Sequence, residues 1–172
     1  MRKINKIIVH CSDSEWGTMK DIKEWHTLSL PKGRGWSHIG YHYIICNGYP
    51  TYNSYKDKRF DLNYCGLTQI ALDDQTEGIH CAGDNKTSIG ICLIGVKTFP
   101  QESLQALNVL LINLLLKYNL KPSDIYGHYE RPSGIKQGKT CPNFNCENLR
   151  KMLIVKFLNS FEEENKSDPV IG

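Results

Sequence analysis

Short apolar segments alternate with longer amphipathic segments along the chain, and this order predicts strands separated by helices. Residues 6–11 (KIIVHC) form a β-branched run that predicts a buried strand, and residues 88–95 (SIGICLIG) have the unbroken apolar pattern of a strand covered on both faces. Apolar residues recur with helical spacing in residues 17–30, and leucines form a broad apolar face in residues 100–120. Together they predict an α/β fold of one domain, in which helices pack against the faces of a sheet.

Further strands and helix boundaries follow from the same pattern. We expect three more strands, at residues 39–46, 67–72 and 123–128. Thr18 is placed to cap the first helix, with Asp21 three residues on, and Asn145 is placed to cap a final helix. We therefore assign residues 1–160 to the domain and expect the charged residues 161–172 to form a flexible tail.

Composition narrows the classes of function. A net charge of +3, evenly spread, does not indicate a nucleic-acid partner. The basic N-terminus lacks the long apolar core of a signal peptide, and the apolar run at residues 108–119 is too short to span a bilayer. The seven cysteines are scattered and odd in number, so a disulfide framework is not expected. We expect a protein without a membrane segment that is cytoplasmic when synthesised.

Three side chains remote in sequence could hold a metal ion. His10 lies at the end of the first predicted strand, His128 at the end of the last, and Cys141 in the loop that follows. Two imidazoles and one thiolate would leave the fourth position of a tetrahedral zinc ion open, as in catalytic zinc sites. Spacing alone also allows a half-buried histidine after a strand and a loop cysteine that only packs.

Six motifs resemble, in order, those of the zinc-dependent N-acetylmuramoyl-L-alanine amidases, a family that includes phage lysozymes of the amidase type and is related to the peptidoglycan recognition proteins. The motifs run from Ile7 to Phe144 and are IIVHCS, IKEWH, GWSHIGYHYII, GIHCAGDNKTSIGICLIG, YGHYE and KTCPNF. The resemblance implies a central mixed β-sheet flanked by α-helices, one zinc ion per chain, and cleavage of the amide between N-acetylmuramic acid and L-alanine by a zinc-activated water.

The resemblance also implies roles for individual residues. The zinc ligands would be His10, His128 and Cys141, and the residues that assist catalysis would be Tyr41 and Lys139. A hydroxyl can exchange a proton at the tetrahedral centre, and an ammonium group can stabilise the developing oxyanion. Without a catalytic role, the tyrosine would be a half-buried strand aromatic and the lysine a solvated loop charge.

Five more residues receive weaker assignments. His80 would contact substrate near the cleft, as a histidine often does at this place in the family. Glu130 could support His128 or accept a proton. Strand alternation would direct His42 away from Tyr41 and Cys11 away from His10, so that Cys11 would be buried, and His26 would be structural.

Two departures from the family stand out. Where the simplest members have a tight turn, this chain inserts residues 47–64, which are too irregular for a helix and predict a long loop, with room for a small hairpin. Its four tyrosines either shape the cleft and select among wall structures or pack on one another; they are Tyr49, Tyr52, Tyr55 and Tyr64. Leu72 stands where an arginine is frequent, so contacts of that arginine are not expected here.

The preferred interpretation is a peptidoglycan hydrolase that acts as a phage or prophage endolysin on the cell wall after release. Its substrate would be peptidoglycan or a muropeptide, and we expect a monomer. Two alternatives within the resemblance are a non-catalytic module that binds muropeptides and a cytoplasmic amidase that recycles them. A hydrolase with Cys11 or Cys141 as nucleophile is a third, and zinc-protected alkylation of the thiols would separate it.

Overall fold

The computed structural model describes residues 2–155 and contains a five-stranded sheet with strand order β3-β2-β4-β1-β5. The strands are β1 (Lys6–Cys11), β2 (Tyr43–Asn47), β3 (Cys65–Ile70), β4 (Ser88–Leu93) and β5 (Ile125–Gly127). β1 pairs in parallel with β4 and β5, and β2 pairs in parallel with β4. The edge strand β3 is antiparallel to β2, so the sheet is mixed and its central strand is the predicted segment SIGICL.

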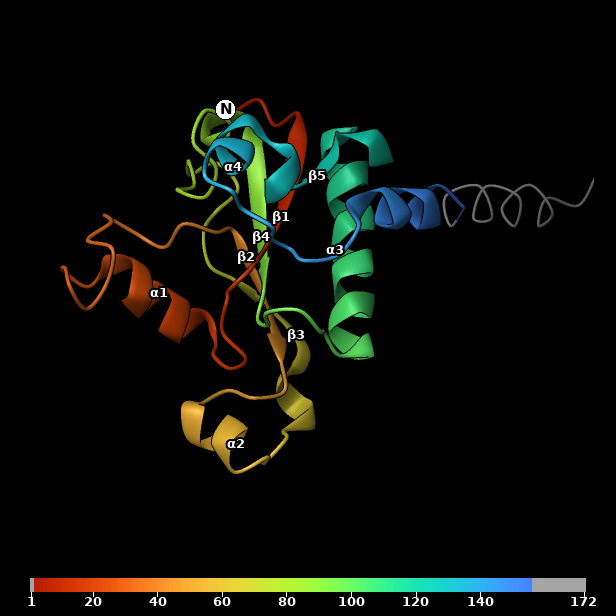
Figure 1. Ribbon diagram of the computed structural model, residues 1–172. Coiled ribbons are helices and arrows are strands. Elements are labelled where there is room, and N and C mark those ends of the chain that lie inside the picture. Colours follow the sequence, from red (N-terminus) through yellow and green to blue (C-terminus); the bar gives the residue numbers. More distant parts are fainter. Residues whose placement is uncertain (1, 156–172) are drawn as a thin grey trace, which may run out of the picture.

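Helices cover both faces of the sheet, with α1 on one side and α3 on the other (Figure 1). The main helices are α1 (Met19–Thr27), α2 (Tyr52–Lys56), α3 (Gln101–Tyr118) and α4 (Pro132–Lys136), and residues 146–155 are also helical. The described residues also contain four short 3₁₀ turns: η1 (Leu62–Tyr64), η2 (Asn85–Thr87), η3 (Pro122–Asp124) and η4 (His128–Glu130). Across the described residues, no helix has the length and apolarity that crossing a membrane requires.

The predicted helix boundaries agree with the structure. Asp21 accepts hydrogen bonds from the backbone N–H and the hydroxyl of Thr18, each at 2.8 Å, which fixes the start of α1. Asn145 accepts a 3.1 Å hydrogen bond from the backbone N–H of Asn148 at the start of the last helix. The end of the predicted domain at residue 160 and the predicted tail, residues 161–172, lie outside the described part of the chain.

The two faces of the sheet differ in how they are filled. The α3 face holds the large apolar core, in which Val9, Ile91 and Leu111 are each fully buried. The α1 face holds a smaller cluster around Ile22 and Ile44, and Leu72 packs against it. The side chains of β1 alternate between these faces, so consecutive residues reach different environments.

Residues 47–64, the segment that the resemblance predicts to be an insertion, are more regular than the sequence predicts. The segment contains the helix α2 and the turn η1, so the expectation of an irregular loop or hairpin is wrong. Thr51 caps α2 by accepting a 3.1 Å hydrogen bond from the backbone N–H of Ser54, whose hydroxyl in turn accepts from the Thr51 N–H at 3.0 Å. This reciprocal pair stabilises a helix of only five residues. The segment forms a lobe beyond the end of the sheet (Figure 1).

Candidate active site

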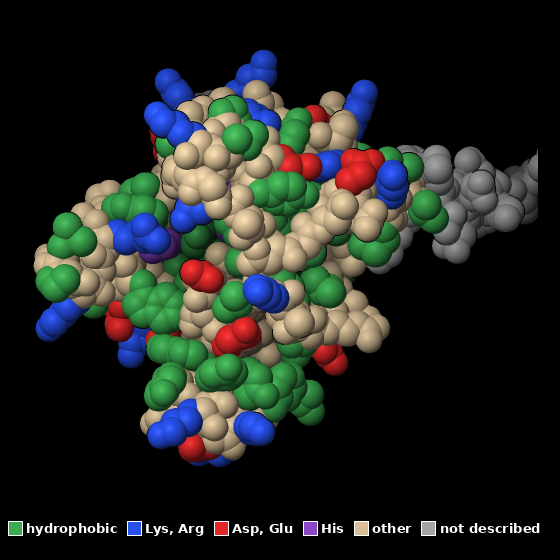
Figure 2. Space-filling view, in the orientation of Figure 1, with side chains coloured by type: hydrophobic (Ala, Val, Ile, Leu, Met, Phe, Trp, Pro, Cys, Tyr) green, Lys and Arg blue, Asp and Glu red, His purple; other side chains and the backbone are tan. Residues whose placement is uncertain are grey.

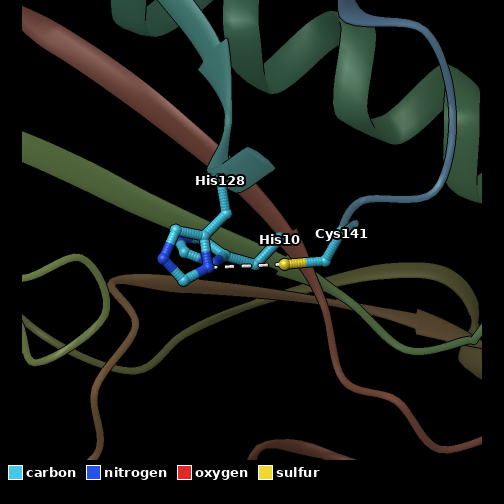
Figure 3. Close-up of side chains that lie close together, drawn as sticks. All are labelled: His10, His128 and Cys141. Atoms are coloured by element: carbon cyan, nitrogen blue, oxygen red, sulfur yellow. Dashed lines mark hydrogen bonds between the residues drawn. The ribbon is translucent and has the colours of Figure 1, made fainter. Parts of the chain in front are cut away.

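The three predicted metal ligands converge, with ligand atoms that all lie within 4.8 Å of one another. Parallel pairing of β1 with β5 aligns Val9 with Gly127, so His10 and His128 follow at the same end of the sheet. Their ring centroids are 4.6 Å apart. Cys141 arrives from the loop after α4 and places Sγ 3.4 Å from His128 Nδ1 (Figure 3).

The electrostatics of this cluster favour the ligating form of Cys141, whereas His128 must lose a proton before it can bind a metal. The adjacent Cys11 thiol, followed by His10 and His128, lowers the pKa of Cys141 to about 2 against the opposing effect of burial. Burial lowers the pKa of His10. Burial also acts to lower that of His128, but contacts with the Cys141 and Cys81 sulfurs outweigh it and raise the pKa to about 9. The site therefore stabilises a thiolate, the form of cysteine that ligates metals.

The donor set fits a zinc ion. Two imidazole nitrogens and one thiolate sulfur are ligands that zinc prefers, and three protein ligands leave a coordination position for water or substrate. His128 Nε2 is buried and has no hydrogen-bond partner among the described residues, while Nδ1 faces Cys141. Nδ1 is therefore the His128 nitrogen placed to bind a metal together with Cys141.

A cleft of about 410 Å³ opens above the three ligands. Tyr41 lines its wall, and its ring centroid lies 5.1 Å from that of His10. Burial raises the pKa of Tyr41, so its phenol stays protonated and able to donate. Lys139 is an exposed residue on the loop that carries Cys141, at the rim of the same cleft.

Comparison with known proteins identifies the family. Residues 1–144 match the family described as N-acetylmuramoyl-L-alanine amidase. The chain belongs to this amidase family. It is 31% identical over 152 residues to the endolysin of Escherichia phage T7, and the match covers 82% of each protein.

Solved structures agree with this assignment of the fold. The N-acetylmuramoyl-L-alanine amidase LysC from Clostridium intestinale has a TM-score of 0.65 and 25% identity, over 88% of this chain and 85% of that protein. Wild-type Drosophila PGRP-LB has a TM-score of 0.57 and 21% identity, over 84% and 85%. The sheet with helices on both faces is therefore the fold of the amidases and peptidoglycan recognition proteins, as the sequence predicts.

His80 of this amidase lies beside a predicted ligand. It lines the cleft but is only 8% exposed. Its Nδ1 is 3.1 Å from His10 Nε2, and its Nε2 is 3.4 Å from Ser88 Oγ, which donates to the Asp84 carbonyl at 2.7 Å. A Cβ at Gly90 would lie 2.6 Å from the His80 ring, so glycine there makes room for this contact. The most direct contact of His80 is with His10.

The contacts of Glu130 and Cys11 bear on the roles predicted for them. Glu130 accepts from the Gly127 backbone N–H at 2.7 Å and from Arg150 at 2.8 and 3.0 Å. Glu130 therefore fixes the backbone just before His128, and these donors occupy both of its carboxylate oxygens. Cys11 is buried as expected, but it lies beside Cys141 and lines the cleft, so the expectation that it points away from the site is wrong.

Two further histidines are buried acceptors on this side of the sheet. His26 Nδ1 accepts from the Gly40 backbone N–H at 3.0 Å, and the ring lies 5.3 Å from that of Tyr41, in keeping with a structural role. The His42 ring lies 5.8 Å from that of His80. Of the described residues, Tyr41 lines the cleft and His42 does not, so nothing contradicts the prediction that their side chains point apart.

Sequence reasoning did not single out Arg34 and Trp36, which also line the cleft. The Arg34 guanidinium lies 5.3 Å from the centroid of the Trp36 ring, a cation–π contact. Trp36 lies within the motif GWSHIGYHYII, and Arg34 directly precedes it. The charge of Arg34 and the size of Trp36 are the sequence signals that could have indicated them. They place a fixed positive group at the cleft mouth.

Proposed function

We propose that this amidase-family protein is a zinc-dependent peptidoglycan hydrolase that cleaves the amide between N-acetylmuramic acid and L-alanine and serves as a phage or prophage endolysin. Family membership and the likeness to the endolysin of phage T7 over most of both chains support the proposal. The observation that carries it is the convergence of His10, His128 and Cys141 below an open cleft.

The proposed ligands would hold one zinc ion through two imidazoles and the Cys141 thiolate. When bound, zinc supplies Lewis acidity and brings the pKa of a bound water near neutrality. The remaining roles in the reaction are assigned to side chains of the protein. His10 and His128 are fixed by adjacent strands, so the ligand geometry is set before substrate binds.

Tyr41 and Lys139 are proposed to act on the scissile amide. A protonated phenol donates a hydrogen bond to an oxygen on which negative charge develops, and the high pKa of Tyr41 preserves that proton. The Lys139 ammonium, at the rim of the cleft, adds positive charge for the same oxyanion. Both contacts strengthen as the carbonyl becomes tetrahedral, which is the condition for lowering the barrier.

His80 is proposed to act mainly by orienting His10 and not by contacting the substrate. In the arrangement that satisfies every partner, His10 Nε2 donates to His80 Nδ1, and His80 Nε2 donates to Ser88 Oγ. This order fixes the tautomer of His10 and leaves its Nδ1 free for the metal. Groups that orient metal-bound histidines in this way are common around zinc sites.

The test is release of new L-alanine amino termini from purified peptidoglycan. We expect the zinc-loaded protein to release them, a chelator to abolish release, and added zinc to restore it. Cys141→Ala should lose zinc and activity together. Full activity in the chelated protein or in this variant would contradict the zinc mechanism, and binding of muropeptides without release would indicate a binding module instead.

A further inference from the structure

Three aromatic side chains connect the cleft to the inserted lobe at residues 47–64. Trp25 on α1 lines the cleft, and the Trp16 ring meets it edge-on at a centroid distance of 5.3 Å. Tyr52 on α2 lies 5.9 Å from Trp16, again in an edge-on arrangement. We refer to Trp25, Trp16 and Tyr52 as the aromatic path.

The lobe has its own aromatic cluster, which separates its tyrosines by role. Tyr49 packs at 5.6 Å from Tyr55 and 5.4 Å from Phe60, so these rings hold the lobe together. Tyr52 is 54% exposed and is paired with Trp16 outside the lobe. The Tyr52 hydroxyl makes no hydrogen bond with any described residue. We therefore expect the Tyr52 ring, rather than its hydroxyl, to contact a ligand.

The path is held in place by two hydrogen bonds between the lobe and the segment that carries Trp16. Asn47 Nδ2 donates to the Glu15 carbonyl at 2.8 Å, and the Gly17 N–H donates to the Tyr49 carbonyl at 2.9 Å. These two bonds flank Trp16 in sequence. The relative positions of Trp16 and the lobe are therefore fixed rather than left to a flexible loop.

The surface agrees with an extended site. Hydrophobic side chains form a band from the hollow that contains a histidine, left of centre, down to the lobe (Figure 2). The cleft itself, about 410 Å³, is near the low end of the roughly 300–1,000 Å³ that encloses one compact ligand. A polymer whose reacting amide occupies the cleft must therefore continue over the surrounding surface.

We propose that the aromatic path is a saccharide-binding subsite that holds the glycan strand of peptidoglycan as it leaves the cleft. Sugar rings present C–H groups on an apolar face, and these meet the negative face of an aromatic ring favourably. The path begins at a cleft-lining residue, which makes it continuous with the site of the amide. The proposal rests on the proposed function, because that function supplies an amino-sugar polymer as substrate.

The first test measures binding without catalysis. Peptide-free tetrasaccharides of alternating N-acetylglucosamine and N-acetylmuramic acid are titrated into the protein by calorimetry. We expect Tyr52→Ala and Trp16→Ala to weaken binding about five- to tenfold, the scale of an aromatic contact, and Tyr52→Phe to bind like the parent. Leu62→Ala is the control, an exposed apolar residue of the same lobe outside the path and the ring cluster, and should leave affinity unchanged.

Because Tyr52 is exposed, its variants test the proposal even if Trp16→Ala does not fold. Equal affinity of Tyr52→Ala and the parent, or no binding by the parent, would overturn the subsite. The second measurement is the ratio of kcat/KM on glycan strands to kcat/KM on a single muropeptide, which should fall in Tyr52→Ala. If the parent binds the saccharide but does not cleave the amide, the proposed function is wrong and the subsite stands. If the parent cleaves the amide and the ratio is unchanged in Tyr52→Ala, the subsite is wrong and the proposed function stands.

Discussion

The two faces of the sheet carry different tasks on the same strands. On β1, Val9 points into the α3 core and is 0% exposed, while its neighbour His10 points to the cleft side and is 1% exposed. Burial alone does not separate the two residues. Their partners do: Val9 meets aliphatic side chains, whereas His10 meets His80, His128 and the Cys141 thiolate.

The comparison explains how a polar cluster can be held rigidly. The α3 face is a continuous apolar core that fixes strands β1, β2 and β4. The α1 face has fewer apolar contacts and uses buried histidines as acceptors for backbone N–H groups, such as His26 for Gly40 and His42 for Gly90. One face supplies stability, and the other can then hold a cluster of polar ligand side chains.

The largest expected effects come from substitution of two adjacent residues of β1, His10 and Val9. His10→Ala should abolish amide cleavage and zinc binding, because it removes one of only two imidazole ligands in the cluster. The metal-free variant should still fold, since the α3 core is untouched. Activity on peptidoglycan, bound zinc and thermal unfolding of the metal-free protein are the three measurements.

Val9→Ala is the matched control on the other face. It should cost about 2 kcal/mol of unfolding free energy by removing buried apolar surface. Below its melting temperature it should keep its zinc and its kcat. If His10→Ala unfolds the metal-free protein while Val9→Ala destroys zinc binding, the division of tasks between the faces is wrong.

The strands, the long helices and the convergence of His10 and His128 were predictable from sequence because local signals and tertiary structure agree there. The apolar run at β4 and the leucine face of α3 specify burial directly. His10 and His128 follow from motifs at strand ends, where parallel pairing brings them together. The Thr18 and Asp21 pair likewise carries its own helix start signal.

Other features depend on contacts that no local pattern encodes. The helix α2 is short, and beyond its local Thr51 cap it is stabilised by the ring cluster around Tyr49. Cys11 meets Cys141 only through the path of a distant loop. Their positions become visible only when the chain is folded.

A smaller effect is expected from acid, and it tests the histidine acceptors of the α1 face. Burial lowers the pKa of His26 and of His42 to about 4, from an ordinary value of 6.5. The folded state thus favours the neutral rings, and their contribution to stability is complete above pH 6.5 and is lost as the pH falls toward 4. Each ring should contribute at most about 3 kcal/mol.

The measurement is urea unfolding of the metal-free protein between pH 7.5 and 4. Cys141, with its pKa lowered to about 2, and His128, with its pKa raised to about 9, also contribute to the pH dependence of the parent, and comparison with His26→Gln cancels these shared contributions. His26→Gln should start less stable and lose less stability across it. A pH dependence as steep in His26→Gln as in the parent would show that this ring is not among the titrating groups.

The smallest effect concerns the helices that cover the two faces. Asp21→Ala removes the carboxylate that accepts from Thr18 at the start of α1 and should cost about 1 kcal/mol locally. α1 buries only Ile22 and His26, so this loss should appear as local opening. Hydrogen exchange of residues 19–27 should quicken about fivefold, the factor that corresponds to this energy.

Glu102→Ala is the matched change, because Glu102 is the acidic residue in the first turn of α3. That helix is anchored in the large core by Leu107, Leu111 and Leu115, so exchange of residues 101–118 should change little beyond its first turn. Since α1 also carries Trp25 of the cleft, Asp21→Ala should raise KM while leaving kcat near the parent value. Equal quickening of exchange in both helices would mean that the two faces open together, and the site would then share the stability of the core instead of resting upon it.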